Sequence, residues 1–413
     1  MRNLTYLPEG LLKYLKRLER LVITNCFELV YLRSRLPHEF QNLASLQELV
    51  ITDCPKLEFF PGTIFPLNLK GLVLRGCGLE SFPEYTINNI SSLEYLYITG
   101  CLVLTSFPRD NKAIPTTFKQ LTIDHCPNLE FLPEGLMHGS NIFLELLEIF
   151  DCSSVTSFPG GKLPKTLKTL TIWNCCNLES LADTITEEMS LESLRIGNCT
   201  NLKYLPSNLH TLVHLDYLEV DGCPSIESFP EDGLPCTRLK KMHVLSCDNL
   251  KFLANRMQYL TCLQELRLSN CPMIVSFPED GMPINLLSLD VKDCKNMKPI
   301  TEWNLHRLNS LKKLRIHGCC LNDDDIFPEW LLPSTLESLH LIKLHNLKSL
   351  SPWLKNLTSL EDLKIKECQK ILSLPNEGLP SMISFLEING CPLLQKSCEE
   401  DWSSINHIPC IVM

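Results

Sequence analysis

The chain has 413 residues, 44% of them hydrophobic, and 38 basic against 48 acidic residues give a formal net charge of −10. This acidic balance argues against nucleic acid as the main partner. No apolar run approaches the roughly 18 residues that a membrane-spanning helix needs, and residues 1–8 do not have the pattern of a signal peptide.

The first coil of the chain is expected to be incomplete. Residues 1–8 align with residues 126–133, so that Met1 stands where a repeated cysteine stands elsewhere. We therefore predict a partial repeat at 1–17, about 16 leucine-rich repeats at 18–395 and a C-terminal cap at 396–413. Because repeat arrays need capping units, we expect either a preceding segment in a longer protein or a truncated gene product.

The dominant feature of the chain is the repeated unit Leu-x-x-Leu-x-Ile-x-x-Cys-x-x-Leu-x-x-Phe/Leu-Pro. Its second copy reads Leu46, Leu49, Ile51, Cys54, Leu57, Phe60 and Pro61. A unit of about 23 to 28 residues with this spacing is typical of leucine-rich repeats. We predict an α/β repeat solenoid, a leucine-rich-repeat horseshoe with a parallel β-sheet on the concave face and irregular or 3₁₀ structure on the convex side.

Each unit predicts one short strand followed by an irregular crossing. Leu49 and Ile51 are expected to point into the core, and Glu48, Val50 and Thr52 to point out. Proline-rich outer segments such as 230–235 and 278–283 predict turns rather than helices. Residues 11–18 and 303–311 are the better candidates for helices.

The cysteine of each unit predicts a buried ladder of reduced thiols. Their regular spacing at one repeat position does not offer disulfide geometry at every step, and the absence of Cys-x-x-Cys removes the usual zinc frame. The predicted structural ladder includes Cys54, Cys101, Cys126, Cys152, Cys199, Cys223, Cys271 and Cys368.

No motif in the chain predicts catalysis. Residues 160–162 are followed by Leu163 and lack the spacing of a phosphate loop, and neither a zinc-protease, a serine-hydrolase nor a kinase signature occurs. The acidic run 323–325 is expected to be a solvated loop. We therefore predict a protein that is not an enzyme, with no cofactor and no metal site.

The predicted binding surface is the concave strand face, where outward side chains surround the buried leucines. Aromatic residues gather there in the earlier coils, and basic residues in the later ones, which suits an acidic protein surface. The aromatic residues could instead pack against lateral neighbours, and the charges could be an ordinary solvated face. His243, His317 and His340 are expected to contact solvent or a partner rather than a metal. The candidate protein-binding residues are Tyr95, Tyr97, Phe150, Trp173, Arg195, Tyr217, Lys241, Arg267, Arg315 and Lys364.

Three features of the chain carry a family resemblance. They are the repeat Leu-x-Ile-x-x-Cys-Pro-x-Leu-x-x-Phe/Leu-Pro, as at 51–61 and 123–133, the Glu/Asp-Gly-Leu-Pro outer turns and the ending at 400–409. The chain resembles the leucine-rich-repeat region of plant intracellular nucleotide-binding leucine-rich-repeat disease-resistance proteins of the coiled-coil type. The nucleotide-binding and signalling domains of that family have no counterpart here, so no residue is expected to bind ATP or ADP.

The resemblance implies a protein-recognition module in plant defence, in the cytoplasm or shared between nucleus and cytoplasm. Its expected partner is a pathogen effector, a guarded host protein or the missing nucleotide-binding domain of the same receptor, which the repeats would restrain. One alternative is a substrate adaptor of an F-box ubiquitin ligase, whose repeats usually have a more helical outer face. Another is a secreted receptor ectodomain, which would use the sequons at Asn89 and Asn356.

Overall fold

The computed structural model describes residues 5–6, 12–30, 43–58, 65–82, 90–107, 115–133, 143–158, 163–181, 185–186, 188–279, 281–318, 331–350, 353–375 and 378–413. The chain forms two compact units, Met1–Leu215 and Asp216–Met413. The predicted acidic loop at 323–325 and the cysteine pair 319–320 lie outside the described residues.

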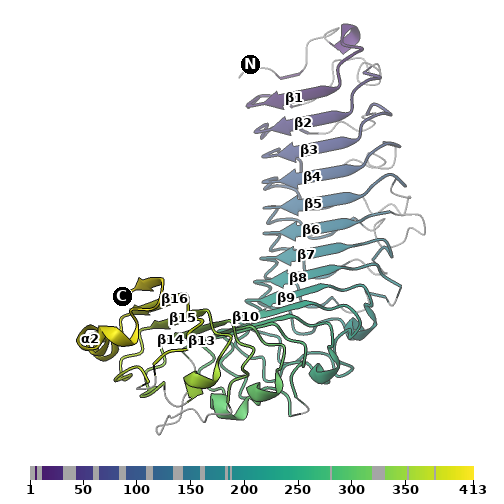
Figure 1. Cartoon of the computed structure of the whole chain (residues 1–413). Helices are drawn as coiled ribbons and strands as arrows, with labels where there is room; N and C mark the ends of the chain where they lie inside the picture. Colours follow the sequence, from purple (N-terminus) through teal and green to yellow (C-terminus); the bar gives the residue numbers. More distant parts are fainter. Residues whose placement is uncertain are drawn as a thin grey trace. The chain divides into compact units, whose positions relative to one another are not determined.

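The first unit is a stack of parallel strands of five residues each, one per coil (Figure 1). Neighbours in the chain are neighbours in the sheet, and equivalent repeat positions lie opposite each other, as Leu21, Leu49 and Leu72 do. The described residues of this unit include the 3₁₀ helices η1 (Leu12–Tyr14) and η3 (Leu209–Thr211). The strands are β1 (Arg20–Thr24), β2 (Glu48–Thr52), β3 (Gly71–Arg75), β4 (Tyr95–Thr99), β5 (Gln120–Asp124), β6 (Leu146–Phe150), β7 (Thr169–Trp173) and β8 (Ser193–Gly197).

The second unit repeats the same arrangement with nine parallel strands in chain order. They are β9 (Tyr217–Asp221), β10 (Lys241–Leu245), β11 (Glu265–Ser269), β12 (Ser288–Lys292), β13 (Lys313–His317), β14 (Ser338–Ile342), β15 (Asp362–Lys366), β16 (Phe385–Asn389) and β17 (Cys410–Val412). The 3₁₀ helices on the return segments are η4 (Met257–Tyr259), η5 (Ile300–Glu302), η6 (Leu305–Arg307), η7 (Trp353–Asn356) and η8 (Trp402–Ser404).

The core of each unit is built from the repeat positions that the sequence marks as apolar. In β2 the burial alternates along the strand, so that Leu49 and Ile51 are buried while Glu48, Val50 and Thr52 are half-buried on the outside. Fully burying one leucine contributes about 1.5–3 kcal/mol, and each coil repeats several such positions. The parallel strands and the irregular, 3₁₀-containing return segments confirm the predicted leucine-rich-repeat fold.

The residue before each repeat cysteine, or before Leu344 in the unit that has leucine at this position, adopts a left-handed backbone conformation, which turns the chain sharply out of the strand. This conformation is unfavourable for most L-residues and is tolerated by glycine, asparagine and aspartate. The positions that show it are Asn25, Asp53, Gly76, Gly100, His125, Asp151, Asn174, Asn198, Gly222, Ser246, Asn270, Asp293, Gly318, Lys343, Glu367 and Gly390. Most of these positions are Asn, Asp or Gly, and this composition is a signal for the turn that the sequence-based expectations did not include.

The cysteine that follows this turn is buried and closes the corner of the coil. The Cys54 thiol donates to the carbonyl oxygen of Thr52 at 3.4 Å, and the Leu57 amide donates to the carbonyl oxygen of Cys54 at 3.0 Å. Burial raises the pKa of the Cys152 and Cys175 thiols to about 12. The ladder cysteines predicted from the sequence are all buried and make this contact to the residue two positions before: Cys54, Cys101, Cys126, Cys152, Cys199, Cys223, Cys271 and Cys368.

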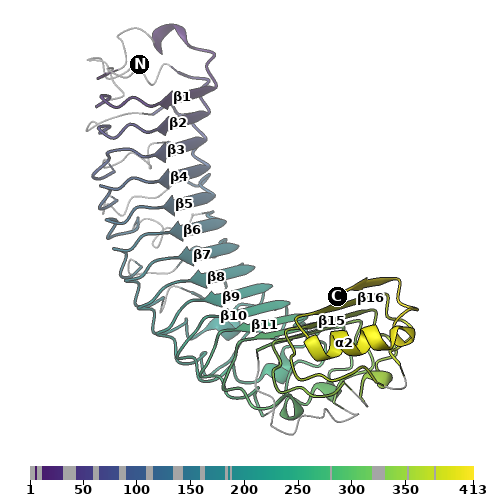
Figure 2. The ribbon, with the colours of Figure 1, turned by 90° about the vertical axis from the view of Figure 1, so that its left-hand side faces the viewer.

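Two helix expectations need correction, and one helix was not anticipated. Residues 11–18 and 303–311 form only the short 3₁₀ segments η1 and η6, because their apolar residues are used at single turns of the coil. The α-helix of the described chain is α2 (Pro392–Glu400), which begins with proline at its first turn, a favourable position. It contacts β16 (Figure 2), and β17 pairs with the edge of β16 that is opposite to β15.

Candidate protein-binding surface on the strand face

The strands of each unit present three rows of outward side chains, at their first, third and fifth positions, which we name the first, middle and last rows. Because the strands pair in register, equivalent positions on neighbouring coils lie side by side. Each residue of the predicted binding surface therefore has two lateral neighbours that are known from its repeat position.

Two tyrosines form a packed aromatic cluster on β4 of the first unit. Tyr95 leans over Gly71 of β3, whose missing side chain leaves room for the ring, and its hydroxyl donates to Glu48 on β2 at 3.1 Å. The Tyr97 hydroxyl donates to Gln120 at 2.9 Å, and the two rings lie 5.4 Å apart. Burial, followed by the Glu48 charge, raises the pKa of Tyr95 to about 12.

A second aromatic cluster lies on β6 to β8 of the same unit. Trp173 covers Gly197 of β8, and the Arg195 guanidinium lies 5.7 Å from the centre of the Trp173 ring. Phe150 is opposite Trp173 in the strand register. Cation–π contact and lateral packing hold these side chains in place, while each remains half-buried and open to the outside.

The structure thus brings five predicted residues into two clusters of the first unit and places Tyr217 in the second unit. The lateral packing considered as an alternative for the aromatic residues is present. It does not bury them, since Tyr95, Tyr97, Phe150 and Trp173 all stay half-buried. A glycine at an outward strand position marks both clusters, and this signal in Gly71 and Gly197 was missed by the sequence analysis.

Charged and titratable residues fill the middle row of the second unit from β9 to β16. The row runs Glu219, His243, Arg267, Asp290, Arg315, His340, Lys364 and Glu387. The basic strip predicted from the sequence is therefore interleaved with carboxylates. Lys241 is exposed 3.9 Å from Glu265, and Lys364 lies 5.1 Å from the centre of the Phe385 ring.

The expectation that His243 and His340 contact solvent or a partner is wrong, because both are only 9% exposed. His243 bridges Tyr217 and Glu265, with both contacts at 3.0 Å. His340 contacts Asp362 at 2.8 Å and Ser338 at 3.2 Å. Burial lowers the pKa of His340, and the neighbouring positive charges of Lys364 and Arg315 lower it further. The contact with Asp362 raises this pKa, but the lowering effects outweigh it.

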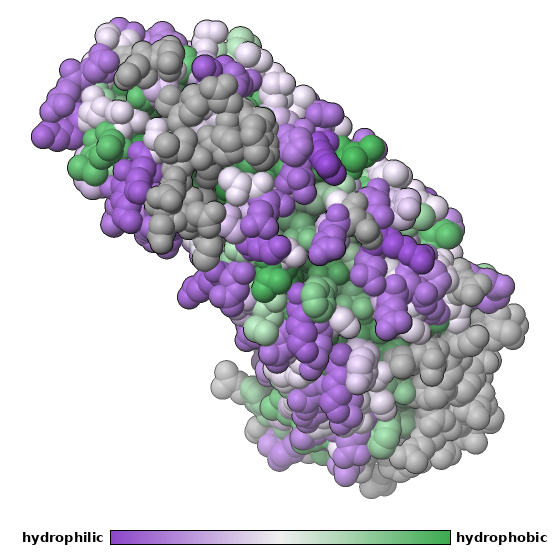
Figure 3. Space-filling view, turned by 90° about the horizontal axis from the view of Figure 1, so that it is seen from below, coloured by the Kyte–Doolittle hydropathy of each residue, from purple (hydrophilic) through white to green (hydrophobic). Residues whose placement is uncertain are grey.

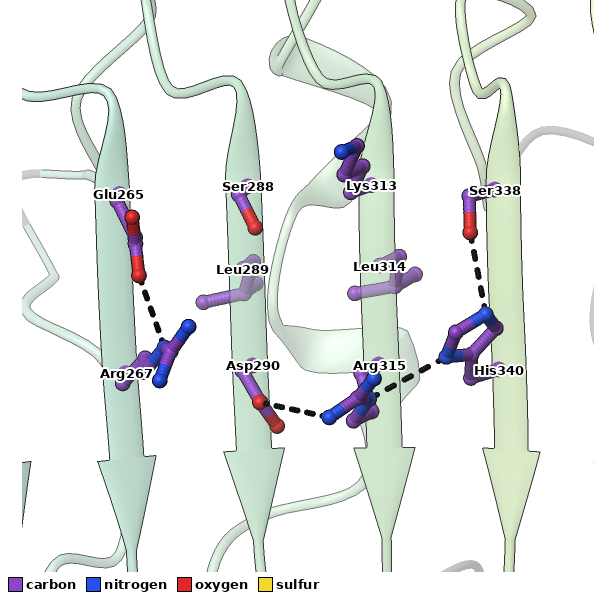
Figure 4. A pocket seen from close by; sticks show the side chains of 10 residues that line it. All are labelled: Glu265, Arg267, Ser288, Leu289, Asp290, Lys313, Leu314, Arg315, Ser338 and His340. Carbon is purple, nitrogen blue, oxygen red and sulfur yellow. Dashed lines mark hydrogen bonds and ion pairs between the residues drawn. The ribbon is translucent and has the colours of Figure 1, made fainter.

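A shallow pocket of about 260 Å³ opens on the strand face over β11 to β14 (Figure 4). Predicted residues Arg267 and Arg315 lie in its middle row, on either side of Asp290. Burial raises the pKa of Glu265, but His243, Arg267 and Lys241 outweigh it and hold this pKa below its usual value. The first row of the pocket consists of Glu265, Ser288, Lys313 and Ser338, which were not among the predicted site residues.

No group of three or more His, Cys, Asp or Glu side chains that could hold a metal ion occurs in the part of the chain that the structure describes. Over the same residues, no helix is long and apolar enough to cross a membrane. On the face seen in Figure 3, hydrophobic surface is divided into small patches by hydrophilic side chains.

The sequence of the repeats is similar to that of known plant proteins. No family model matches the chain. The Arabidopsis thaliana protein At3g14460, which is named a disease resistance protein, is 33% identical over 341 residues, which are 81% of this chain and 22% of that protein. The A. thaliana disease resistance protein RPS4B is 29% identical over 144 residues, 35% of this chain and 11% of its own length. The chain thus spans about a fifth of the length of the first of these relatives.

Two solved structures share the fold. A leucine-rich-repeat protein of Leptospira interrogans, LIC12759, covers 99% of this chain and 93% of its own with a TM-score of 0.54 at 18% identity. The leucine-rich effector protein YopM of Yersinia pestis covers 83% and 88% with a TM-score of 0.51 at 20% identity. At these identities the likeness concerns the fold alone. The chain therefore has the leucine-rich-repeat fold, and the sequence of its repeats is similar to that of plant disease resistance proteins.

Proposed function

We propose that this chain is the protein-recognition module of a plant immune receptor and that it binds its partner on the strand face. The observation that carries the proposal is the pair of aromatic clusters on the first unit. Tyr97 and Trp173 are held by neighbouring strands yet half-open to the outside. Rigid, half-exposed aromatic side chains are the usual anchors of protein interfaces, because little conformational entropy is lost when they bind.

The kinship to disease resistance proteins supports a role in defence, with a pathogen effector, a guarded host protein or a nucleotide-binding domain of the same receptor as the partner. In this proposal the module binds and restrains but carries out no reaction, and it acts in the cytoplasm or in cytoplasm and nucleus. The proposal assigns nucleotide binding to no residue of this chain.

Proximity labelling in plant cells tests the proposal. The chain is fused to a biotin ligase and compared with the double variant Tyr97→Ala/Trp173→Ala. The matched control is Tyr204→Ala/Tyr259→Ala, which removes two exposed aromatic residues outside the outward rows of the strands. We expect the double variant to lose specific partners that the control keeps, with each aromatic residue contributing more than about 1 kcal/mol to binding.

Retention of all partners by the strand-face variant would reject the binding surface. Labelling dominated by a cullin scaffold would favour the ubiquitin-ligase adaptor over the immune-receptor module. Labelling of a nucleotide-binding protein of the same plant would identify restraint of the switch as the use of this face.

A further inference from the structure

We propose that the pocket over β11 to β14 binds a carboxylate, namely an aspartate or glutamate side chain presented by the protein partner. The inference deepens the proposed function, on which it rests for the existence of that partner. It assigns a specific subsite and a ligand chemistry to one part of the strand face.

The pocket is built from two rows of side chains that the strand register brings together. The middle row supplies Arg267, Asp290, Arg315 and His340, and the first row supplies Glu265, Ser288, Lys313 and Ser338. Figure 4 shows the two arginines converging from β11 and β13 on either side of Asp290, with Lys313 on the other row. Leu289 and Leu314 form the floor between the rows. Three cations therefore surround an open space of about 260 Å³.

The arginines are held in position by contacts that leave donors unused. Arg267 contacts Glu265 through Nε at 2.8 Å. Arg315 contacts Asp290 through Nη1 at 3.6 Å and donates from Nε to His340 at 3.3 Å. A guanidinium has five N–H donors, so donors remain on both residues for a ligand oxygen. The fixed geometry lowers the entropy lost on binding.

The charge of the pocket selects the ligand. Arg267, Lys313 and Arg315 carry three positive charges against two negative charges on Glu265 and Asp290, while the buried His340 is neutral at neutral pH because burial disfavours its charged form. The excess is a single positive charge, which one carboxylate neutralises. A phosphate, with a charge of about −1.5 to −2, would leave an excess of negative charge beside Asp290.

The Lys313 side chain makes no polar contact with a described residue that would stabilise the fold. It is exposed and has no ion pair or side-chain hydrogen bond with any residue that the structure describes.

Fluorescence anisotropy with a labelled hexaglutamate peptide tests the proposal on the purified chain in 150 mM NaCl at pH 7.5. The test variant is Arg267→Gln/Arg315→Gln. The matched control is Lys292→Gln/Lys366→Gln, which removes the same charge from the last row of the same unit, outside the pocket. We expect the test variant to bind about tenfold more weakly than wild type, and the control to lose less than about twofold.

A hexaglutamine peptide, which is not expected to bind, controls for contacts of the peptide backbone. Thermal unfolding of both variants shows whether the fold is kept. If the test variant unfolds early, the single variant Lys313→Gln replaces it, because that side chain has no structural contact to lose, and a several-fold loss is again expected. Equal weakening in test and control variants, no binding by wild type, or tighter arginine-dependent binding of a phosphoserine peptide would each overturn the proposal.

This test is independent of the test of the proposed function. Peptide binding through the arginines without any partner in plant cells would leave the carboxylate site standing and reject the recognition module. If the Tyr97→Ala/Trp173→Ala variant loses a partner but the peptide does not bind through the arginines, the recognition module stands and the carboxylate site is rejected.

Discussion

The Tyr95 hydroxyl donates a hydrogen bond to Glu48 at 3.1 Å although the strand of Gly71 lies between them. The contact exists because Gly71 leaves an empty outward position, which the tyrosine ring fills. One missing side chain therefore links three coils through a single aromatic residue. The same device recurs where Trp173 covers Gly197.

Replacing Gly71 with alanine should release Tyr95, because the added methyl group would overlap the ring. Tyr95 would lose burial and the Glu48 contact, so we expect its pKa to fall from about 12 toward the ordinary value of 10. A ¹³C NMR titration of labelled tyrosine measures this, with Tyr95→Phe assigning the resonance. Gly197→Ala is the control, since it displaces Trp173 and should leave the Tyr95 titration unchanged. An unaltered Tyr95 pKa in Gly71→Ala would contradict the glycine-gap explanation.

The buried thiols should be protected from alkylation while exposed ones react. Burial raises the pKa of Cys152 and Cys175 to about 12, so almost none of either thiol is ionised at pH 8, and the thiolate is the reactive form. Cys236 and Cys410 are exposed. We expect iodoacetamide to label Cys236 and Cys410 at least about 100-fold faster in the native protein, as peptide mass spectrometry would show. In urea the difference should vanish. Fast native labelling of Cys152 would refute the buried ladder.

The stability of the chain should fall on mild acidification because of His340. Its pKa is lowered in the folded state, chiefly by burial, so the neutral form is favoured there. A lowered histidine pKa gives a contribution that is complete above the unfolded value of about 6.5 and is lost as the pH falls below it. Urea denaturation at pH 7.5, 6.5 and 5.5 measures the slope.

In His340→Gln this slope should become shallower, whereas His214→Gln, at an exposed position, should keep it. A steeper slope in His340→Gln would mean that Asp362, at 2.8 Å, stabilises a charged histidine and that the sign of the effect is reversed.

The left-handed turn at the end of each strand should respond to glycine, as at Lys343, which precedes Leu344. Lys343 has a φ of 54°, which costs a non-glycine residue about 1–2 kcal/mol. Lys343→Gly should raise the free energy of unfolding by about 0.5 kcal/mol, since relief of strain is partly offset by the greater entropy of glycine in the unfolded chain. The reverse change, Gly390→Ala at a φ of 66°, should lower it by about 1 kcal/mol. Circular dichroism during chemical denaturation measures both, and opposite signs would contradict the strain argument.

The positions of the strands and the identity of the buried residues followed from the sequence because the repeat is strict. Leu49, Ile51 and Cys54 recur at fixed offsets, and a strand alternates its faces with a period of two, so burial at each position is determined locally. Helix propensity was a weaker guide. Residues 303–311 form only the 3₁₀ turn η6, because their apolar residues are buried in the coil and not along one helix face.

The composition of the strand face was also determined by the sequence, but its contacts were decided by the tertiary structure. The repeat register alone places Arg267, Asp290 and Arg315 side by side. The direction in which Tyr95 or His243 leans depends on the volume of neighbouring side chains, as the empty position at Gly71 shows. Those volumes act between residues more than 20 positions apart in the chain. Only the stacked coils therefore determine which outward residues are locked together and which remain open for a partner.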